Sequence, residues 1–142
     1  MTGTPHRLFL DANVLFSAAW AEGPCRILIE LGQAGEAEVL TSVHAWAETR
    51  RNLARKRPDR LPFLKAAIAP VVAVVQCGPS GSALPAHLPD KDRVVLDAAV
   101  ALRCTHFITG DRAHFGALVG TAVEGVLVLT PRQYLGLRAS AM

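Results

Sequence analysis

The stretch RLFLDAN, residues 7–13, places an aspartate directly after a short run of apolar residues. The stretch HFITGD, residues 106–111, repeats this arrangement much later in the chain. Each run is short enough to be a buried strand, and each aspartate ends its run. In an open sheet of parallel strands, the carboxyl ends of the strands border one crevice, where ligands bind. The sequence therefore predicts that Asp11 and Asp111 face each other across adjacent strands.

The rest of the chain alternates short apolar runs with segments of helical periodicity. Strands are expected where the runs are short or rich in β-branched residues, at 7–10, 38–41, 71–75, 105–109 and 126–129. Helices are expected at 24–31, from the N-cap Ser42 to about 55, and at 61–69, 90–103, 112–119 and 131–137. This alternation predicts an α/β fold with three layers (α/β/α), in which helices cover both faces of a central parallel sheet.

Two segments are expected to lack regular structure. The residues after the first strand, from Asp11 to about Ala21, are interpreted as a turn. Residues 77–89 are rich in glycine, proline and serine and predict a loop. This loop is not a phosphate-binding loop, because no Gly-Lys-Ser/Thr motif follows it.

The composition indicates a compact domain spanning residues 1–142. Hydrophobic residues make up 51% of the chain and charged residues 19%, which is enough to fill a core. The three cysteines are widely spaced without a CxxC pair, so neither a disulfide framework nor a zinc ribbon is expected. The apolar N-terminal stretch is interrupted by Asp11 and Asn13, unlike a signal peptide, and no run is long enough to span a membrane. We therefore expect a cytoplasmic protein.

The basic residues are unevenly distributed along the chain. The net charge is only +3, but seven of the fifteen lysines and arginines fall between Arg50 and Lys65. A basic cluster beside an acidic pocket would suit a polyanionic substrate whose phosphates must be neutralised. The alternative interpretation of the cluster is the solvated end of a helix. Arg51, in the cluster, and Arg112, next to Asp111, are the candidates to hold substrate phosphates.

Each acid also has a structural interpretation. Asp11 could be the N-cap of a helix that begins at Asn13, since aspartate is common at that position. A placement directly after an apolar strand nevertheless leaves its carboxylate poorly solvated without a partner. Glu48 lies on the same helix face as Arg51, and an exposed i,i+3 ion pair is the simple alternative.

A third acid must be chosen from the stretch DKDRVVLDAA, residues 90–99. Asp90 is expected to cap the helix, and Asp97 to pair with Arg93 at i,i+4. Asp92 then remains as the acid that projects into the crevice, with Asp90 as the alternative.

Converging carboxylates repel one another unless a cation neutralises them. Oxygen ligands suit Mg²⁺ or Mn²⁺ better than Zn²⁺, which prefers histidine and cysteine. His114 lies close to Asp111 in sequence and could contact a substrate, but we interpret it as a histidine packed on a helix. The sequence therefore predicts a site for Mg²⁺ or Mn²⁺ made of acids.

The stretches DANVLFSA, AETRRNL, DKDRVVLDAA and FITGD, in this order, resemble the PIN-domain family of metal-dependent ribonucleases. The resemblance extends from Leu8 to Tyr134 and is strongest to small single-domain members that are toxins of bacterial toxin–antitoxin pairs. It implies that the metal-binding and catalytic acids are Asp11, Glu48, Asp92 and Asp111. It also implies that Asn13 and Thr109 support the first and last of these acids.

The same resemblance implies RNA as substrate, Mg²⁺ or Mn²⁺ as cofactor, and products with 5′-phosphate and 3′-hydroxyl ends. It further implies a small antitoxin protein as partner and often a homodimer. Two departures stand out: Ala12 replaces a threonine of many members, and Ala113 and His114 occupy positions where some members carry a further acid. The second departure leaves open whether a second metal is held before RNA binds.

Two other functions compete with this prediction. A non-catalytic RNA-binding or scaffold module would keep the fold without activity. An aspartyl-phosphate phosphatase also begins with an aspartate at a strand end, but it needs another acid two residues later, where this chain has Asn13.

Overall fold

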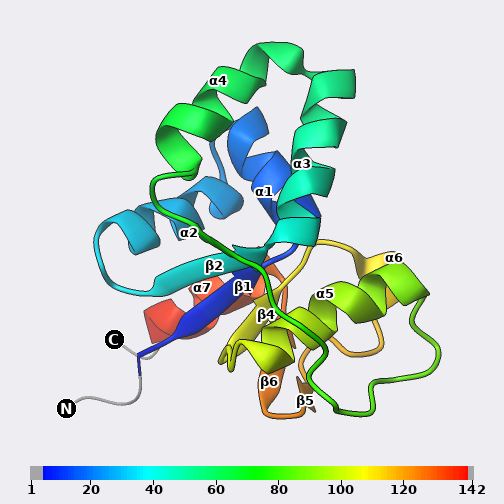
Figure 1. Cartoon of the computed structure of the whole chain (residues 1–142). Helices are drawn as coiled ribbons and strands as arrows, with labels where there is room; N and C mark the ends of the chain where they lie inside the picture. Colours follow the sequence, from blue (N-terminus) through cyan, green and yellow to red (C-terminus); the bar gives the residue numbers. More distant parts are fainter. Residues whose placement is uncertain (1–4, 141–142) are drawn as a thin grey trace.

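The computed structural model describes residues 5–140, which form a six-stranded sheet between two layers of helices. The strand order is β3-β2-β1-β4-β6-β5 (Figure 1). The strands are β1 (Arg7–Leu10), β2 (Glu38–Ser42), β3 (Ala73–Val75), β4 (His106–Ile108), β5 (Ala122–Val123) and β6 (Val126–Leu129). Every pair is parallel except β5 with β6. The expected α/β fold with a mostly parallel sheet is therefore confirmed.

Helices cover the sheet on both faces. The α-helices are α1 (Ala12–Trp20), α2 (Pro24–Gln33), α3 (Val43–Lys56), α4 (Leu61–Phe63), α5 (Asp90–Ala101), α6 (Arg112–Phe115) and α7 (Pro131–Ser140). A short 3₁₀ turn, η1 (Pro58–Arg60), precedes α4, and a π-helical turn, η2 (Leu64–Ile68), follows it. Core residues of α2, η2 and α7, and most of those of α1 and α3, pack on one face, whereas those of α5 and α6, with Ala12 and Ala45 at the starts of α1 and α3, pack on the other.

The alternation of side chains along β1 divides the core between these layers. Leu8 and Leu10 point to the face covered by α1, α2 and α7, whereas Phe9 points to the face covered by α5. Phe9 stacks on Phe107 of β4 with ring centroids 5.5 Å apart. Both faces of the central strands are thus buried, which explains why these strands read as continuous apolar runs.

The segment after β1 is a helix, and the expectation of a turn was wrong. Asp11 is the N-cap of α1, and its side chain accepts a hydrogen bond from the backbone N–H of Ala12. The helix starts one residue earlier than the capping alternative predicted. Its buried residues, among them Val14, Leu15, Ala18 and Ala19, lie on one side of the helix. The other side carries Phe16 and Trp20, so apolar residues occur around most of the circumference and the hydrophobic periodicity is weak.

Smaller differences concern the ends of elements. The third strand begins at Ala73 rather than at residue 71, and α6 ends at Phe115 rather than at 119. The expected helix 61–69 is divided into α4 and η2. Strand β5 was not expected; it pairs with β6 through a turn in which Glu124 and Gly125 both have positive φ, as in hairpin turns of type I′.

The topology places one crevice at the carboxyl end of the sheet. The chain passes from β1 to β2 on one side, and β4 lies on the other side of β1. Strand order therefore changes direction between β1 and β4, and such a switch point is where parallel α/β sheets bind ligands. Within residues 5–140, no helix has the length and apolar character needed to cross a membrane.

Candidate metal centre

Asp11 lies at the switch point and is buried, with 6% of its surface exposed. Its backbone N–H donates to the carbonyl of Ile108, the last residue of β4, at 3.0 Å. One carboxylate oxygen, Oδ1, accepts from Ala12 N at 2.8 Å. The other, Oδ2, accepts from the Thr109 hydroxyl at 2.8 Å and from Asn13 Nδ2 at 3.0 Å. Asp11 is therefore the N-cap of α1, and its carboxylate also binds Thr109 at the end of β4.

Asn13 and Thr109 connect the ends of the two strands. Besides its bond to Asp11, Asn13 accepts from the backbone N–H of Gly110 at 2.7 Å and lies 3.3 Å from the Thr109 hydroxyl. Thr109 Oγ1 also accepts from the backbone N–H of Asp111 at 3.1 Å. A Cβ at position 110 would lie 3.2 Å from Asn13 Oδ1, so glycine allows this close approach. Hydrogen bonds of Thr109 thus connect the carboxylate of Asp11 to the backbone of Asp111.

The pKa of Asp11 is raised to about 6, chiefly by burial and to a smaller extent by the nearby charge of Glu48. Hydrogen bonds from Thr109, Ala12 and Asn13 lower the pKa and offset part of this effect. An isolated buried carboxylate is costly, so a positive charge nearby would stabilise its ionised form.

Asp92, Asp111 and His114 form a second group of side chains. Their ligand atoms all lie within 4.8 Å of one another. The Nδ1 atom of His114 is 2.8 Å from Oδ2 of Asp92 and 3.0 Å from Oδ2 of Asp111. Asp111 is the N-cap of α6, where its Oδ1 accepts from the backbone N–H of His114 at 3.1 Å. This leaves Oδ2 of Asp111 directed to the other two side chains.

Within residues 5–140, the Oδ2 atom of Asp92 has no hydrogen-bond donor. Asp92 is 7% exposed, and burial raises its pKa, with the charges of Asp111 and Glu48 acting in the same direction and His114 opposing them. Although His114 Nδ1 is close to Asp92 Oδ2, the geometry is not that of a hydrogen bond. Among residues 5–140 both atoms are buried without a hydrogen-bond partner. Ligand atoms that approach without bonding one another, with one acid deeply buried, fit a divalent cation between them.

Asp92 lies next to Asp111 and His114, whereas the contacts that the sequence led us to expect for Asp90 and Asp97 were wrong. The N-cap of α5 is Pro89, and no side chain of the described residues caps this helix. Asp90 is exposed and pairs with Arg93 at i,i+3. Asp97, expected to pair with Arg93, instead accepts hydrogen bonds from the backbone N–H and the hydroxyl of Ser80. Asp92 therefore faces the site because its position in the first turn of α5 directs it inward.

Glu48 connects the two groups electrostatically. It is half-buried on α3, and its charge raises the pKa values of both Asp11 and Asp92. The two predicted phosphate-binding residues form no ion pair with the acids of the described chain. Arg51 and Arg112 are exposed, and no ion pair or hydrogen bond of their side chains occurs among the described residues.

His114 is the site residue that the sequence interpretation missed. We expected a histidine packed on a helix, whereas its ring lies between two acids. The available signal was its spacing: α6 begins directly after Asp111, so a residue three positions later returns to the same face of the helix.

A comparison with models of protein families identifies a PIN domain over residues 7–113. A comparison with curated proteins finds no match. The matched range contains Asp11, Glu48, Asp92 and Asp111, and His114 follows it directly. Because the match covers more than half of the chain, this protein belongs to the PIN domain family, whose members are typically metal-dependent nucleases.

Proposed function

We propose that this protein is an endoribonuclease that depends on Mg²⁺ or Mn²⁺ and hydrolyses phosphodiester bonds of RNA. The observation that carries the proposal is the buried carboxylate of Asp92, which faces Asp111 and His114 and whose Oδ2 atom has no hydrogen-bond donor among the described residues. A buried acid in such surroundings needs a cation. Membership of the PIN domain family supports a nucleic acid as substrate.

The side chains divide into two sets around the proposed centre. Asp92, Asp111 and His114 would form one side, and Asp11 and Glu48 the other, with Asn13 and Thr109 fixing the direction of Asp11. A divalent ion bound there would lower the pKa of a water molecule and polarise a phosphoryl oxygen for in-line displacement. The products would carry 5′-phosphate and 3′-hydroxyl ends, as the family resemblance implies.

Protonation of Asp11 would limit the site in mildly acidic solution. Because the pKa of Asp11 is raised to about 6, its carboxylate is fully charged only above that pH. Asp11 would therefore be a weaker ligand below pH 6.

Exposed Arg51 and Arg112 would hold the phosphates on either side of the cleaved bond.

An imidazole ligand affects the choice of metal. Mg²⁺ strongly prefers oxygen ligands, whereas imidazole suits transition metals. With the ring of His114 between Asp92 and Asp111, we propose that Mn²⁺ binds more tightly than Mg²⁺.

The test is cleavage of a labelled single-stranded RNA in the presence of Mn²⁺. Asp11→Asn and Asp111→Asn should each reduce the rate at least about 100-fold, more than the loss typical of residues that only support a ligand. Asp90→Asn is the matched control, because Asp90 is an exposed acid near the site that pairs with Arg93. Equal rates for all variants would contradict the assignment. Absence of cleavage by every protein, the unmodified chain included, would favour a non-catalytic RNA-binding or scaffold module.

Binding of metal can be measured independently of cleavage. Millimolar Mn²⁺ or Mg²⁺ should raise the melting temperature of the unmodified chain, since the ion binds only the folded site. The increase should be lost in Asp111→Asn and kept in Asp90→Asn.

We further propose that the protein is the toxin of a toxin–antitoxin pair, with a small antitoxin protein as partner and a homodimer as the working form. The proposal rests on the resemblance to small single-domain members of the family. Expression of the chain should arrest growth, and Asp11→Asn should not. Co-expression of a short reading frame found directly upstream of the gene should restore growth. Arrest that does not depend on Asp11 would separate toxicity from nuclease activity.

A further inference from the structure

Helix α1 carries a continuous exposed face that starts at the metal centre. Asn13, Phe16, Ser17 and Trp20 are the residues of α1 that are exposed or half-buried, and their spacing places them on one side of the helix. Asn13 bonds to Asp11 at one end of this face. Trp20 lies at the other end and is 40% exposed, which is unusual for so large an apolar side chain.

Helix α3 runs beside α1 and also leads away from the centre. The Thr49 hydroxyl lies 3.4 Å from the carbonyl oxygen of Ala12, next to Glu48. Two turns later, the ammonium group of Lys56 lies 5.7 Å from the centroid of the Phe16 ring. The distance along α3 from Glu48 to Lys56 is about 12 Å. We call the two faces together the α1–α3 face: Asn13, Phe16, Ser17 and Trp20 on α1, with Glu48, Asn52 and Lys56 on α3.

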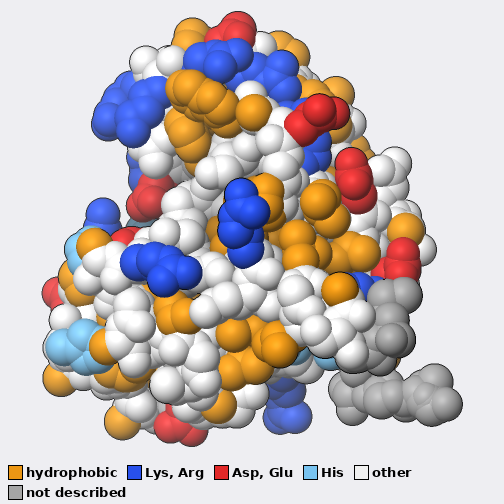
Figure 2. Space-filling view, turned by 180° about the vertical axis from the view of Figure 1, so that it is seen from behind, with side chains coloured by type: hydrophobic (Ala, Val, Ile, Leu, Met, Phe, Trp, Pro, Cys, Tyr) orange, Lys and Arg blue, Asp and Glu red, His pale blue; other side chains and the backbone are white. Residues whose placement is uncertain are grey.

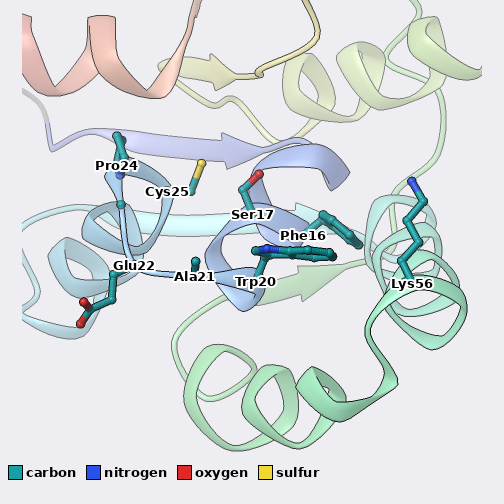
Figure 3. Close-up of a pocket in the computed structure, with 9 residues that line it drawn as sticks. Phe16, Ser17, Trp20, Ala21, Glu22, Pro24, Cys25 and Lys56 are labelled. Carbon is teal, nitrogen blue, oxygen red and sulfur yellow. The ribbon is translucent and has the colours of Figure 1, made fainter.

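The far end of the α1–α3 face borders a pocket of about 490 Å³ (Figure 3). The end of α1, residues 21–23, the start of α2 and Lys56 line this pocket. Figure 3 shows Trp20 and Phe16 side by side, between Glu22 and Lys56. The ring centroids of Phe16 and Trp20 are 5.4 Å apart. The guanidinium group of Arg57 lies 4.7 Å from the centroid of the Trp20 ring. The pocket thus offers aromatic surface next to positive charge.

The exposed basic side chains of α3, on the α1–α3 face and beside it, favour a polyanion as the ligand. Arg51, Arg55 and Lys56 are exposed on α3, and none of them forms an ion pair among residues 5–140. Figure 2 shows lysine and arginine side chains gathered around an apolar patch at the end of the molecule that holds α4 and the end of α3. Glu22 is the acid that lines the pocket, on the side opposite Lys56. Basic side chains that alternate with exposed aromatic rings are typical of surfaces that bind single-stranded nucleic acid.

We propose that the α1–α3 face binds single-stranded RNA beside the bond to be cleaved, with one unpaired base in the Trp20 pocket. This inference rests on the proposed ribonuclease function and adds the position of the bound strand. The base would stack on Trp20 or Phe16, and Lys56 would contact the adjacent phosphate. A distance of about 12 Å corresponds to three or four stacked nucleotides, or to fewer if the strand is extended. The bound base would therefore lie a few nucleotides from the cleaved bond.

Binding of a short RNA to Trp20 variants tests this proposal. The probe is a ten-nucleotide oligouridine, U₁₀, titrated in Mn²⁺ into proteins that carry Asp11→Asn to prevent cleavage. An additional Trp46→Phe substitution leaves Trp20 as the tryptophan whose fluorescence reports binding, because the chain has only two. U₁₀ should quench this fluorescence. In anisotropy measurements with labelled U₁₀, Trp20→Ala should weaken binding roughly 5- to 150-fold, the range of one base–aromatic stack, and Trp20→Phe should retain most of the affinity.

Two controls separate stacking from a general defect. The dinucleotide UpU is too short to contact the metal centre and the pocket together, so Trp20→Ala should weaken binding of UpU less than binding of U₁₀. Lys56→Ala should lower the salt dependence of U₁₀ binding by about 0.7 in slope, the value for one phosphate contact, and Lys65→Ala should not. Lys65 is an exposed lysine on η2 and serves as the matched control.

The outcomes distinguish this inference from the proposed function. If the unmodified chain cleaves RNA but Trp20→Ala binds U₁₀ as tightly as the parent protein, the inference is wrong and the proposed function stands. An unquenched Trp20 with tight U₁₀ binding would also contradict it and would favour a protein segment as the occupant of the pocket. Failure of the unmodified chain both to cleave and to bind RNA would overturn the two proposals together.

Discussion

His114 shows how one side chain can alter a site made of acids. Its Nδ1 atom lies within 3.0 Å of carboxylate oxygens of both Asp92 and Asp111. The family resemblance implies a further acid near this position in some PIN-domain proteins, so the proposed site would have a nitrogen ligand where those proteins have an oxygen ligand. We expect the consequence in the choice of metal rather than in the fold, because the ring is only half-buried.

The first prediction concerns metal binding by His114 variants. In pulsed electron paramagnetic resonance of bound Mn²⁺, the unmodified chain should show coupling to a ¹⁴N nucleus, and His114→Asp and His114→Ala should not. His114→Asp should also reduce the preference for Mn²⁺ over Mg²⁺ about 10-fold or more, since an oxygen ligand suits Mg²⁺. His87→Ala, which removes an exposed loop histidine, is the control. A nitrogen coupling that persists in both His114 variants would show that the ring does not bind the metal.

The candidate site could be predicted from the sequence only where position along a strand determines geometry. Asp11 and Asp111 each follow one of two adjacent strands, so their placement at the same edge of the sheet follows from the topology of parallel sheets. Asp92 was chosen by eliminating Asp90 and Asp97, yet neither makes the contact that the elimination assumed. His114 could not be inferred with the same force, because its contact depends on the start of α6 directly after Asp111.

At the scale of elements, the caps of the helices connect stability to the site. Ser42 ends β2 and is the N-cap of α3, as the sequence predicted, and its hydroxyl accepts from the backbone N–H of Ala45 at 3.1 Å. This cap fixes the beginning of the helix that carries Glu48. Asp11 and Asp111 are also caps, of α1 and α6, so both acids have a structural role besides the proposed one.

The second prediction is that Ser42→Ala lowers the free energy of unfolding by about 1 kcal/mol, because a buried N–H loses its side-chain acceptor. Unfolding in urea should show a lower midpoint with an unchanged slope, which indicates a change in stability alone. Ser42→Thr keeps a hydroxyl and should retain most of the stability. An equal loss in both variants would mean that packing around this buried residue, rather than the cap, accounts for the effect.

Element boundaries could be predicted where a local signal was available and not where tertiary contacts decide. The N-cap Ser42 and the proline that begins α7 are local signals, and both helices start as predicted. Helix α1 has only a weak amphipathic pattern, since its exposed side carries the apolar residues Phe16 and Trp20. The loop of residues 77–89 was predicted, but its attachment to α5 was not: Arg93 donates to the carbonyls of Ala86 and Leu88.

At the scale of the whole molecule, the three-layer arrangement follows from the alternation of strands and helices, but the strand order does not. Apolar runs of similar length are interchangeable in sequence, and the order β3-β2-β1-β4-β6-β5 depends on which helix packs on which face. That order matters for function because it places the ends of β1 and β4 side by side. Asp11, after β1, and Asp111 and His114, after β4, are thereby brought to one edge of the sheet.

Three side chains on the sheet and α7 form a cluster away from this edge. His6 precedes β1, His106 begins β4 and Tyr134 lies on α7. The rings of His6 and His106 are 4.6 Å apart, and His106 and Tyr134 are 5.0 Å apart. His6 Nδ1 lies 2.7 Å from the Tyr134 hydroxyl, which also accepts from Arg138, and His106 Nδ1 lies 2.7 Å from the Thr105 hydroxyl. Burial, and then the charge of His6, lowers the pKa of His106 from 6.5 to about 4.

The third prediction follows from this lowered pKa. Between pH 6.5 and pH 4 the unfolded chain binds a proton at His106 that the folded chain does not, so His106 makes folding less favourable as the pH falls through this window. The free energy of unfolding of the unmodified chain, relative to His106→Gln, should therefore decrease by at most about 3 kcal/mol from pH 7 to pH 4. Urea unfolding of both proteins at each pH measures this difference. Asp11 titrates in the same range with the opposite sign, but its contribution is common to both proteins and cancels. A difference between the unmodified chain and His106→Gln that does not change with pH would show that the pKa of His106 is not lowered in the folded protein.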